Sequence, residues 1–274
     1  MGRCITPYDV KKEGGKTFKV PCSRCPECKK RRVSGWSFRL IQEYKICETA
    51  FFITLTYDTK HVEITNKGFL NLNKKHVQKF FKRLRKAQFG NKKGNIRYYV
   101  AGEYGSKTFR PHYHIILYNA DINLISPAWN LGTVHFGTVN EASVGYTLKY
   151  INKATKIPLH KNDDRQKEFS LMSKGLGKNY LTPKMIKWHK SILHERVYCN
   201  IPDNKKIAMP RYYKDKIYNE IEKQIIGKYY EENPQDDFAS SLEQYWNDPQ
   251  AYQSRVDFIY NKQKFKQNNQ KEKL

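Results

Sequence analysis

The sequence predicts an α+β protein in which short strands pair around a hairpin and helices pack beside them. Residues 51–58 are rich in β-branched and aromatic side chains, a composition typical of a buried strand. Residues 96–103 and 110–119 predict two further strands, and the loop between them is short enough for an antiparallel hairpin. Residues 73–88 carry apolar side chains at the spacing of one helix face. Antiparallel strands beside helices belong to the α+β class.

The other elements follow from the same patterns. Residues 28–47 predict a helix that the basic run Lys29–Arg32 opens. Glycine and lysine residues recur along residues 168–180, a composition that favours a loop, and we expect this loop to lie over the functional site described below. The remaining expected elements are a strand at 133–139, helices at 141–153 and 182–193, a short strand at 196–199 and a polar helical pattern beyond 210.

The charge balance indicates a polyanionic partner. Lysine and arginine total 51 against 26 aspartate and glutamate residues, a net charge of +25, which is too large for an ordinary solvated surface. Nucleic acid is the simplest partner for such a chain. The 20 tyrosines suit stacking on unpaired bases. AT-rich coding is an alternative origin of a basic, tyrosine-rich composition.

The cysteines indicate either reduced thiols or a metal site. The sequence has no apolar run of membrane-spanning length and no secretory h-region near its start, so we expect a cytoplasmic protein. In a cytoplasm, thiols stay reduced or bind metals. Cys22, Cys25 and Cys28 form two overlapping CxxC units, and Cys4 could be a fourth ligand of structural zinc. The alternative is a reduced, proline-punctuated loop ahead of a helix.

Two histidines on one strand predict a divalent-metal site. Because side chains alternate between the faces of a strand, His112 and His114 point to the same side. Such a pair chelates a divalent metal if an acidic group lies nearby. The hairpin can bring Glu103 beside them as a third ligand. The alternative is a pair of half-buried histidines satisfied by backbone groups.

A tyrosine-rich helix completes a set suited to phosphoryl transfer. Tyr146, Lys149, Tyr150 and Lys153 fall within an arc of about 100° on a helix. Neighbouring ammonium groups favour the phenolate form of a tyrosine, and a metal on a nearby phosphate takes up its charge. A tyrosine can therefore attack a DNA phosphate and conserve the bond energy as an ester. The alternative is that tyrosine, being amphipathic, only lines a helix surface.

With these motifs in view, the chain resembles the replication initiators of small single-stranded DNA phages of the gokushovirus-like microvirus group. Those proteins are His-hydrophobe-His (HUH) endonucleases of the two-tyrosine type, which start rolling-circle replication. The central hydrophobe of the motif is here Tyr113. The resemblance rests on Pro21–Cys28, Phe51–Asp58, Gly102–Gly105 with Arg110–Ile116, Tyr146–Lys153, Ser173–Gly177 and Pro210–Tyr213.

The resemblance implies a fold, a cofactor and partners. It implies an antiparallel sheet of about four or five strands, with the histidines on a central strand and the nucleophile helix across the sheet face. The resemblance covers about residues 3–215, and we expect a cysteine-rich segment with a basic helix at 1–50, an HUH endonuclease core at 51–215 and a helical basic and polar extension at 216–274. It also implies Mg²⁺ or Mn²⁺ as cofactor, single-stranded phage origin DNA as substrate, and a host helicase and polymerase as partners.

Two alternative functions remain open at the level of sequence. A non-catalytic nucleic-acid-binding regulator with a zinc-stabilised N-terminus would explain the charge and the cysteines. A relaxase or transposase of the same superfamily would act on mobile-element DNA with the same residues.

Overall fold

The computed structural model describes residues 4–11, 15, 17–90, 94–152, 157–202, 205–233, 250, 253–254 and 256–261. The chain forms two compact units. The first combines Met1–Gly35 with Leu181–Leu274, and the second is Trp36–Tyr180. The helix α1 (Pro26–Tyr44) begins in the first unit and continues into the second.

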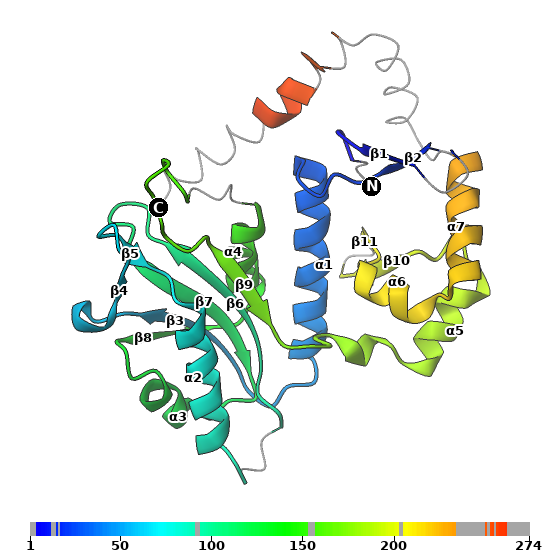
Figure 1. Cartoon of the computed structure of the whole chain (residues 1–274). Helices are drawn as coiled ribbons and strands as arrows, with labels where there is room; N and C mark the ends of the chain where they lie inside the picture. Colours follow the sequence, from blue (N-terminus) through cyan, green and yellow to red (C-terminus); the bar gives the residue numbers. More distant parts are fainter. Residues whose placement is uncertain are drawn as a thin grey trace. The chain divides into compact units, whose positions relative to one another are not determined.

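The second unit is built on one five-stranded antiparallel sheet (Figure 1). The order of its strands is β8-β3-β7-β6-β9, so the strand that carries both histidines is the central one. This sheet confirms the α+β class and the expected number of strands. The strands are β3 (Ala50–Thr56), β6 (Arg97–Tyr104), β7 (Pro111–Tyr118), β8 (Val134–Thr138) and β9 (Phe169–Met172).

Helices cover both faces of this sheet. The helices α2 (Lys74–Ala87) and α3 (Ile122–Ala128) bury their apolar side chains in the main core against one face, to which Ile53 and Ile115 point. The helix α4 (Glu141–Asn152) packs on β6 and β7 from the histidine-bearing face. On that face Trp36 of α1 also contacts Tyr99 of β6, with ring centroids 5.2 Å apart.

The helix α2 begins where its sequence specifies. The side chain of Asn73 accepts hydrogen bonds from the backbone N–H groups of Lys75 and His76, at 2.8 and 3.2 Å. An asparagine in this position satisfies donors that have no partner within the helix. Short elements join the larger ones in this unit: the 3₁₀ turns η1 (Thr59–His61) and η2 (Lys178–Tyr180), and the paired strands β4 (Glu63–Ile64) and β5 (Leu70–Asn71).

The first unit contains two hairpins and several helices. Its hairpins pair β1 (Tyr8–Lys11) with β2 (Thr17–Val20) and β10 (Tyr198–Ile201) with β11 (Lys205–Ala208). In the part of this unit that the structure describes, the helices besides the start of α1 include α5 (Pro183–Ser191), α6 (Arg211–Ile217) and α7 (Glu220–Glu232), and residues 256–261 are also helical.

One expected loop is partly a strand. Within residues 168–180, Phe169–Met172 form β9 and pair with Tyr99–Gly102 of β6. The segment has only four residues, so its alternation is too short to stand out beside the glycines that follow. Its hydrogen-bonding partner lies far away in sequence, which local patterns cannot reveal.

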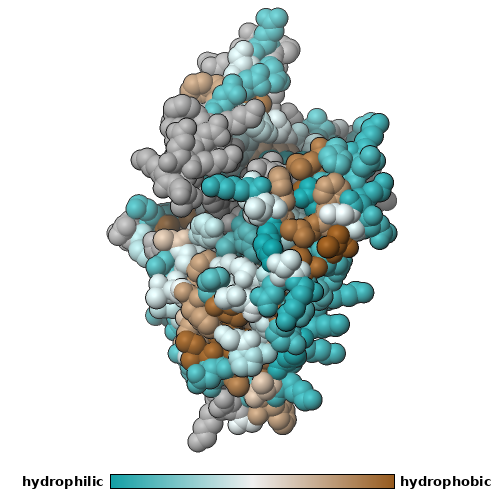
Figure 2. All heavy atoms as spheres, turned by 90° about the vertical axis from the view of Figure 1, so that its left-hand side faces the viewer, coloured by the Kyte–Doolittle hydropathy of each residue, from teal (hydrophilic) through white to brown (hydrophobic). Residues whose placement is uncertain are grey.

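The face of the molecule seen in Figure 2 is mainly hydrophilic, with hydrophobic patches between the hydrophilic side chains. Among the residues that the structure describes, no helix combines the length and the apolar character that crossing a bilayer requires.

Candidate metal centre and nucleophile

The β6–β7 hairpin brings Glu103 directly opposite His112. The two residues are partners in the antiparallel register, and Ala101 is the partner of His114. Residues opposite each other in antiparallel strands lie on the same face of the sheet, and His114 joins that face because it is two residues from His112. Glu103 and His114 are buried and His112 is half-buried. The predicted three residues therefore meet on one face of the central strands.

Both imidazoles converge on a single carboxylate oxygen. Oε1 of Glu103 lies 2.8 Å from Nε2 of His112 and 3.1 Å from Nε2 of His114. Nδ1 of His112 lies 3.1 Å from the carbonyl oxygen of Arg110, which can only accept a hydrogen bond. In the neutral imidazole Nδ1 therefore carries the proton, and Nε2 presents a lone pair to the carboxylate. Two such acceptors are held together favourably only by a proton or a metal ion between them.

The donor set fits a divalent cation. Each of the three residues offers one ligand atom, and these atoms lie within 4.8 Å of one another. Octahedral ligands about 2.1 Å from Mg²⁺ lie about 3.0 Å from their neighbours, close to the two Glu103–histidine distances. Two imidazoles and one carboxylate also suit other divalent ions, since imidazole binds zinc and iron. Three protein ligands leave coordination positions for substrate oxygens.

Thr54 contributes to the site in a way that the sequence did not reveal. Its hydroxyl oxygen lies 2.9 Å from Nδ1 of His114, and the two residues are partners in the β3–β7 register. The hydroxyl is hydrogen-bonded to the imidazole nitrogen that does not face Glu103, so it orients the ring of His114. The alternation of side chains along a strand predicts only which face Thr54 lies on, whereas the pairing with β7 identifies His114 as its partner.

Tyr146 lies beside this centre. Its ring meets that of His114 edge to face, with centroids 5.1 Å apart, and contacts Phe52 at 6.1 Å. The side chain is 38% exposed, so a substrate could reach it. The apolar residues Val144 and Leu148 of the same helix are buried, as its pattern predicts.

The structure does not describe the side chains of the other predicted catalytic residues of this helix. Lys149 and Tyr150 belong to α4 by backbone, but their side chains are not among those described. Lys153 lies outside the described residues. On a regular helix Tyr150 follows Tyr146 by one turn on the same face.

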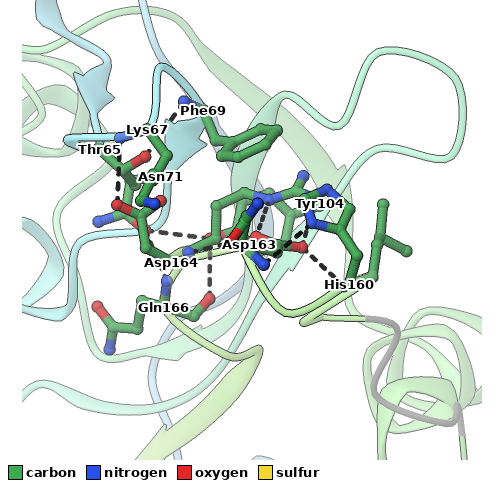
Figure 3. Close-up of polar contacts among 12 residues, drawn as sticks. Thr65, Lys67, Phe69, Asn71, Tyr104, His160, Asp163, Asp164 and Gln166 are labelled. Atoms are coloured by element: carbon green, nitrogen blue, oxygen red, sulfur yellow. Dashed lines mark hydrogen bonds and ion pairs between the residues drawn. The ribbon is translucent and has the colours of Figure 1, made fainter.

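A buried ion pair fixes the chain that follows α4. The guanidinium of Arg165 binds both carboxylate oxygens of Asp163 at 2.8 Å, and both side chains are nearly inaccessible to solvent. The carbon atom of this guanidinium lies 5.3 Å from the ring centroid of Tyr104. The hydroxyl of Tyr104 donates a hydrogen bond of 2.8 Å to the carbonyl of Gln166 (Figure 3). Because Tyr104 follows Glu103 in β6, its side chain points to the opposite face of the sheet, so these contacts hold the segment on the face away from the candidate metal centre.

The four predicted cysteines form a separate cluster in the first unit. The thiols of Cys4, Cys22, Cys25 and Cys28 lie within 4.8 Å of one another. They belong to the start of the chain, to the turn before α1 and to its first turn. Ile5 and Ile259 pack against them, so the C-terminal stretch contributes to this cluster.

The sulfur spacing of the cluster, and the environment of one of its thiols, suit a metal site. The sulfur atoms of Cys25 and Cys4 are 3.8 Å apart, close to the separation of about 3.8 Å that follows from tetrahedral zinc with bonds of about 2.3 Å. Burial raises the pKa of the Cys22 thiol, but the Thr6 hydroxyl and the backbone N–H groups of Arg24 and Cys25 outweigh it and lower the pKa to about 6. Such donors stabilise a thiolate, the form that binds metal.

Comparison with known proteins identifies related sequences. Residues 50–155 match the family model of the replication-associated protein ORF2/G2P. The chain is 30% identical over 197 residues to the replication-associated protein ORF2 of Spiroplasma virus 4, covering 64% of this chain and 61% of that protein. It is 28% identical over 221 residues to the replication-associated protein VP4 of Bdellovibrio phage phiMH2K, covering 73% and 67%.

A third relative, the replication-associated protein ORF4 of Chlamydia phage 1, is 24% identical over 227 residues, covering 73% of this chain and 53% of that protein. The chain thus spans between about half and two thirds of these relatives. These matches confirm the resemblance to phage replication proteins, and the matched residues 50–155 include the metal centre and Tyr146. No solved structure matches the chain.

Proposed function

We propose that this chain starts rolling-circle replication of a small phage by nicking and rejoining single-stranded origin DNA. The observation that carries the proposal is the convergence of His112, His114 and Glu103 with Tyr146 against the same imidazole. The names of the relatives support a role in replication. The net charge of +25 supports a nucleic-acid substrate.

Tyr146 is the proposed nucleophile of the first cleavage. Its phenolic oxygen loses a proton and attacks the phosphorus, the bond from phosphorus to the 3′ oxygen breaks, and that oxygen takes up a proton. The products are a 5′-phosphotyrosine ester and a free 3′ hydroxyl, which the host polymerase extends behind a host helicase. Because the ester conserves the energy of the broken bond, a later 3′ hydroxyl can reverse the step without a nucleotide cofactor.

Tyr150 is the proposed second nucleophile. Replication of a circle needs one cleavage to start and one to release the unit-length strand. While one tyrosine holds the first 5′ end, the other attacks the regenerated origin and frees a 3′ hydroxyl. This hydroxyl attacks the phosphorus of the first phosphotyrosine and closes the circle, and the bond from phosphorus to that tyrosine breaks as its phenolic oxygen takes up a proton. A spacing of one helical turn lets both phenols reach the same phosphate by a small shift. We assign Lys149 and Lys153 to stabilising the phenolates.

Two metals belong to this proposal. Glu103, His112 and His114 would hold Mg²⁺ or Mn²⁺, which when bound withdraws charge from the non-bridging oxygens of the scissile phosphate. Cys4, Cys22, Cys25 and Cys28 would hold structural zinc. The enzyme would act in the cytoplasm of the bacterial host, where the phage DNA is replicated.

The alternatives account for fewer observations. The hypothesis of a non-catalytic regulator explains the basic charge and the cysteine cluster. It does not explain why two histidines and a glutamate converge beside an accessible tyrosine. A relaxase or transposase would use the same residues, but the three relatives described above are replication-associated proteins, each from a virus or phage.

The test is a covalent adduct with DNA. The protein is incubated with 3′-labelled single-stranded oligonucleotides that tile the replicon encoding it, then denatured and separated by electrophoresis. Wild type should form a labelled adduct only when Mg²⁺ or Mn²⁺ is present. His112→Ala/His114→Ala should form none while it retains most DNA affinity, because basic side chains carry that affinity. Full nicking by this double variant would contradict the assignment of His112 and His114 as metal ligands.

Variants of the two tyrosines test whether Tyr146 and Tyr150 act in turn as nucleophiles. Tyr146→Phe and Tyr150→Phe should each retain some single cleavage but fail to circularise a strand, and the double variant should form no adduct. Tyr44→Phe is the matched control, since Tyr44 is exposed and lies on another helix. If one single substitution removes all adduct while the other leaves circularisation normal, the two-tyrosine mechanism is wrong.

A further inference from the structure

The first unit contains a cavity of about 250 Å³ between α1 and β11. One wall consists of Glu27, Lys30, Arg31 and Ser34, whose spacing places them along one stripe of α1. The facing wall is Lys206–Ala208 of β11. The residues of the metal centre belong to the other unit, so this cavity is a separate feature of the chain.

The residues that line the cavity include more cations than anions, and one of these cations lies over an aromatic ring. Lys30, Arg31 and Lys206 line it against a single carboxylate, that of Glu27. The ammonium group of Lys206 lies 4.2 Å from the ring centroid of Tyr198. Tyr198 pairs with Ala208 in the β10–β11 register, so its ring is on the same face as Lys206 and Ala208. Cations beside an aromatic ring are the groups that bind the backbone and bases of a single strand.

One of the lining cations, Arg31, also acts on a lysine that does not line the cavity. The pKa of Lys214 on α6 is lowered by its burial and then by the charge of Arg31. The start of α6 is held close to α1 at Gly35, where an added Cβ would lie 3.5 Å from Cγ of Pro210. The charge of Asp215 partly offsets this repulsion, and an anion bound at Arg31 would offset it further.

The size of the cavity limits the ligand. A volume of about 250 Å³ corresponds to about eight water molecules at their share of liquid volume. That is room for a phosphate and its sugar, and too little for a folded partner. Arg31 can bind a phosphate through two parallel N–H groups, and the lysines supply additional charge.

We propose that this cavity binds a phosphodiester of single-stranded DNA, so that the first unit holds the strand at a point outside the metal centre. The proposal rests on the proposed function only for the identity of the strand. It also gives a role to the basic start of α1, which the nicking chemistry does not use.

The test compares two double variants that remove the same charge. Arg31→Ala/Lys206→Ala removes cavity residues, and Arg32→Ala/Lys205→Ala removes their exposed sequence neighbours, which do not line the cavity. Binding of labelled oligothymidylate is measured by fluorescence anisotropy across a salt series, without added divalent metal. The cavity variant should lose affinity at least about tenfold. Its log–log salt slope should become shallower by about 0.7 for each phosphate that the variant no longer neutralises.

The control variant should lose much less affinity. Equal losses in the two variants, or no loss in either, would overturn the proposal. Thymidine monophosphate is the second probe: if the cavity variant loses only this nucleotide and keeps its oligonucleotide affinity, the site takes a free nucleotide and the assignment to DNA is wrong. Thermal unfolding shows whether both variants are folded. If Arg31→Ala/Lys206→Ala is unfolded, Arg31→Gln/Lys206→Gln is used in its place. Nicking is not needed for binding, so a failed adduct assay would leave this result intact.

Discussion

At the scale of single residues, the two histidines share a carboxylate but are oriented by different partners. The carbonyl of Arg110 can only accept from His112, whereas the hydroxyl of Thr54 can donate to or accept from His114. Both contacts use Nδ1 and leave Nε2 facing Glu103. One imidazole is therefore oriented by the backbone just before β7, and the other by a side chain of the neighbouring strand β3.

We predict that Thr54→Val weakens binding of a divalent metal by at least about tenfold, because groups that orient a ligand histidine contribute that much to affinity. The substitution preserves shape and removes the hydroxyl on His114. Thr56→Val is the control, since the Thr56 hydroxyl donates to the carbonyl of Thr133 and not to a histidine. Mn²⁺ titration followed by electron paramagnetic resonance measures the affinity. Equal weakening in both variants would assign the effect to the strand and not to the contact.

At the scale of elements, the segment after α4 is held by electrostatics as well as by packing. The carbon atom of the Arg165 guanidinium lies 5.0 Å from the ring centroids of both Phe69 and Phe109. The Arg165 guanidinium, through its hydrogen bonds, holds the pKa of the Asp163 carboxyl far below its usual range. Such a group adds stability above its unfolded pKa of about 3.9. This contribution is lost as the pH falls from there towards the folded pKa.

We predict that Arg165→Met lowers the free energy of unfolding by about 3–5 kcal/mol at neutral pH, because it leaves the carboxylate of Asp163 buried and unpaired. The double variant Asp163→Asn/Arg165→Met should lower the free energy of unfolding by less than Arg165→Met does, because no unpaired charge stays buried. Urea denaturation measures both. Lys228→Met is the control, because it removes an exposed ion pair with Glu232 worth only about 0.3–0.5 kcal/mol. A double variant less stable than Arg165→Met would contradict the argument.

The cysteine cluster ties the start of the chain to α1. We predict that purified protein contains one zinc per chain and that removing it lowers the melting temperature, because Cys4 is then no longer joined to the turn of Cys22 and Cys25. Elemental analysis and melting with and without a chelator measure this. Cys47→Ser is the control, as Cys47 is outside the cluster. Protein free of zinc and equally stable in chelator would rule the site out.

At the scale of the whole molecule, local patterns predict which residues meet at the candidate metal centre better than they predict its surroundings. Period-two alternation and a short hairpin loop suffice to join His112 and His114 to Glu103. The same patterns miss β9 and the contact between Thr54 and His114, because both depend on pairing between strands distant in sequence. They also miss the position of Arg165 among rings from three other segments, which depends on tertiary packing.

The last prediction concerns the charge of the entire chain. With a net charge of +25, we expect the affinity for single-stranded DNA to be dominated by released counterions. It should fall with salt along a log–log slope of about −0.7 for each phosphate neutralised. Anisotropy titrations of an oligonucleotide at several salt concentrations measure this slope. A peptide nucleic acid of the same base sequence is the control, since it keeps the stacking bases and lacks the phosphates, and it should bind weakly. If DNA affinity hardly changes with salt and the uncharged strand binds equally well, the tyrosines provide the affinity by stacking and the excess of lysine and arginine does not.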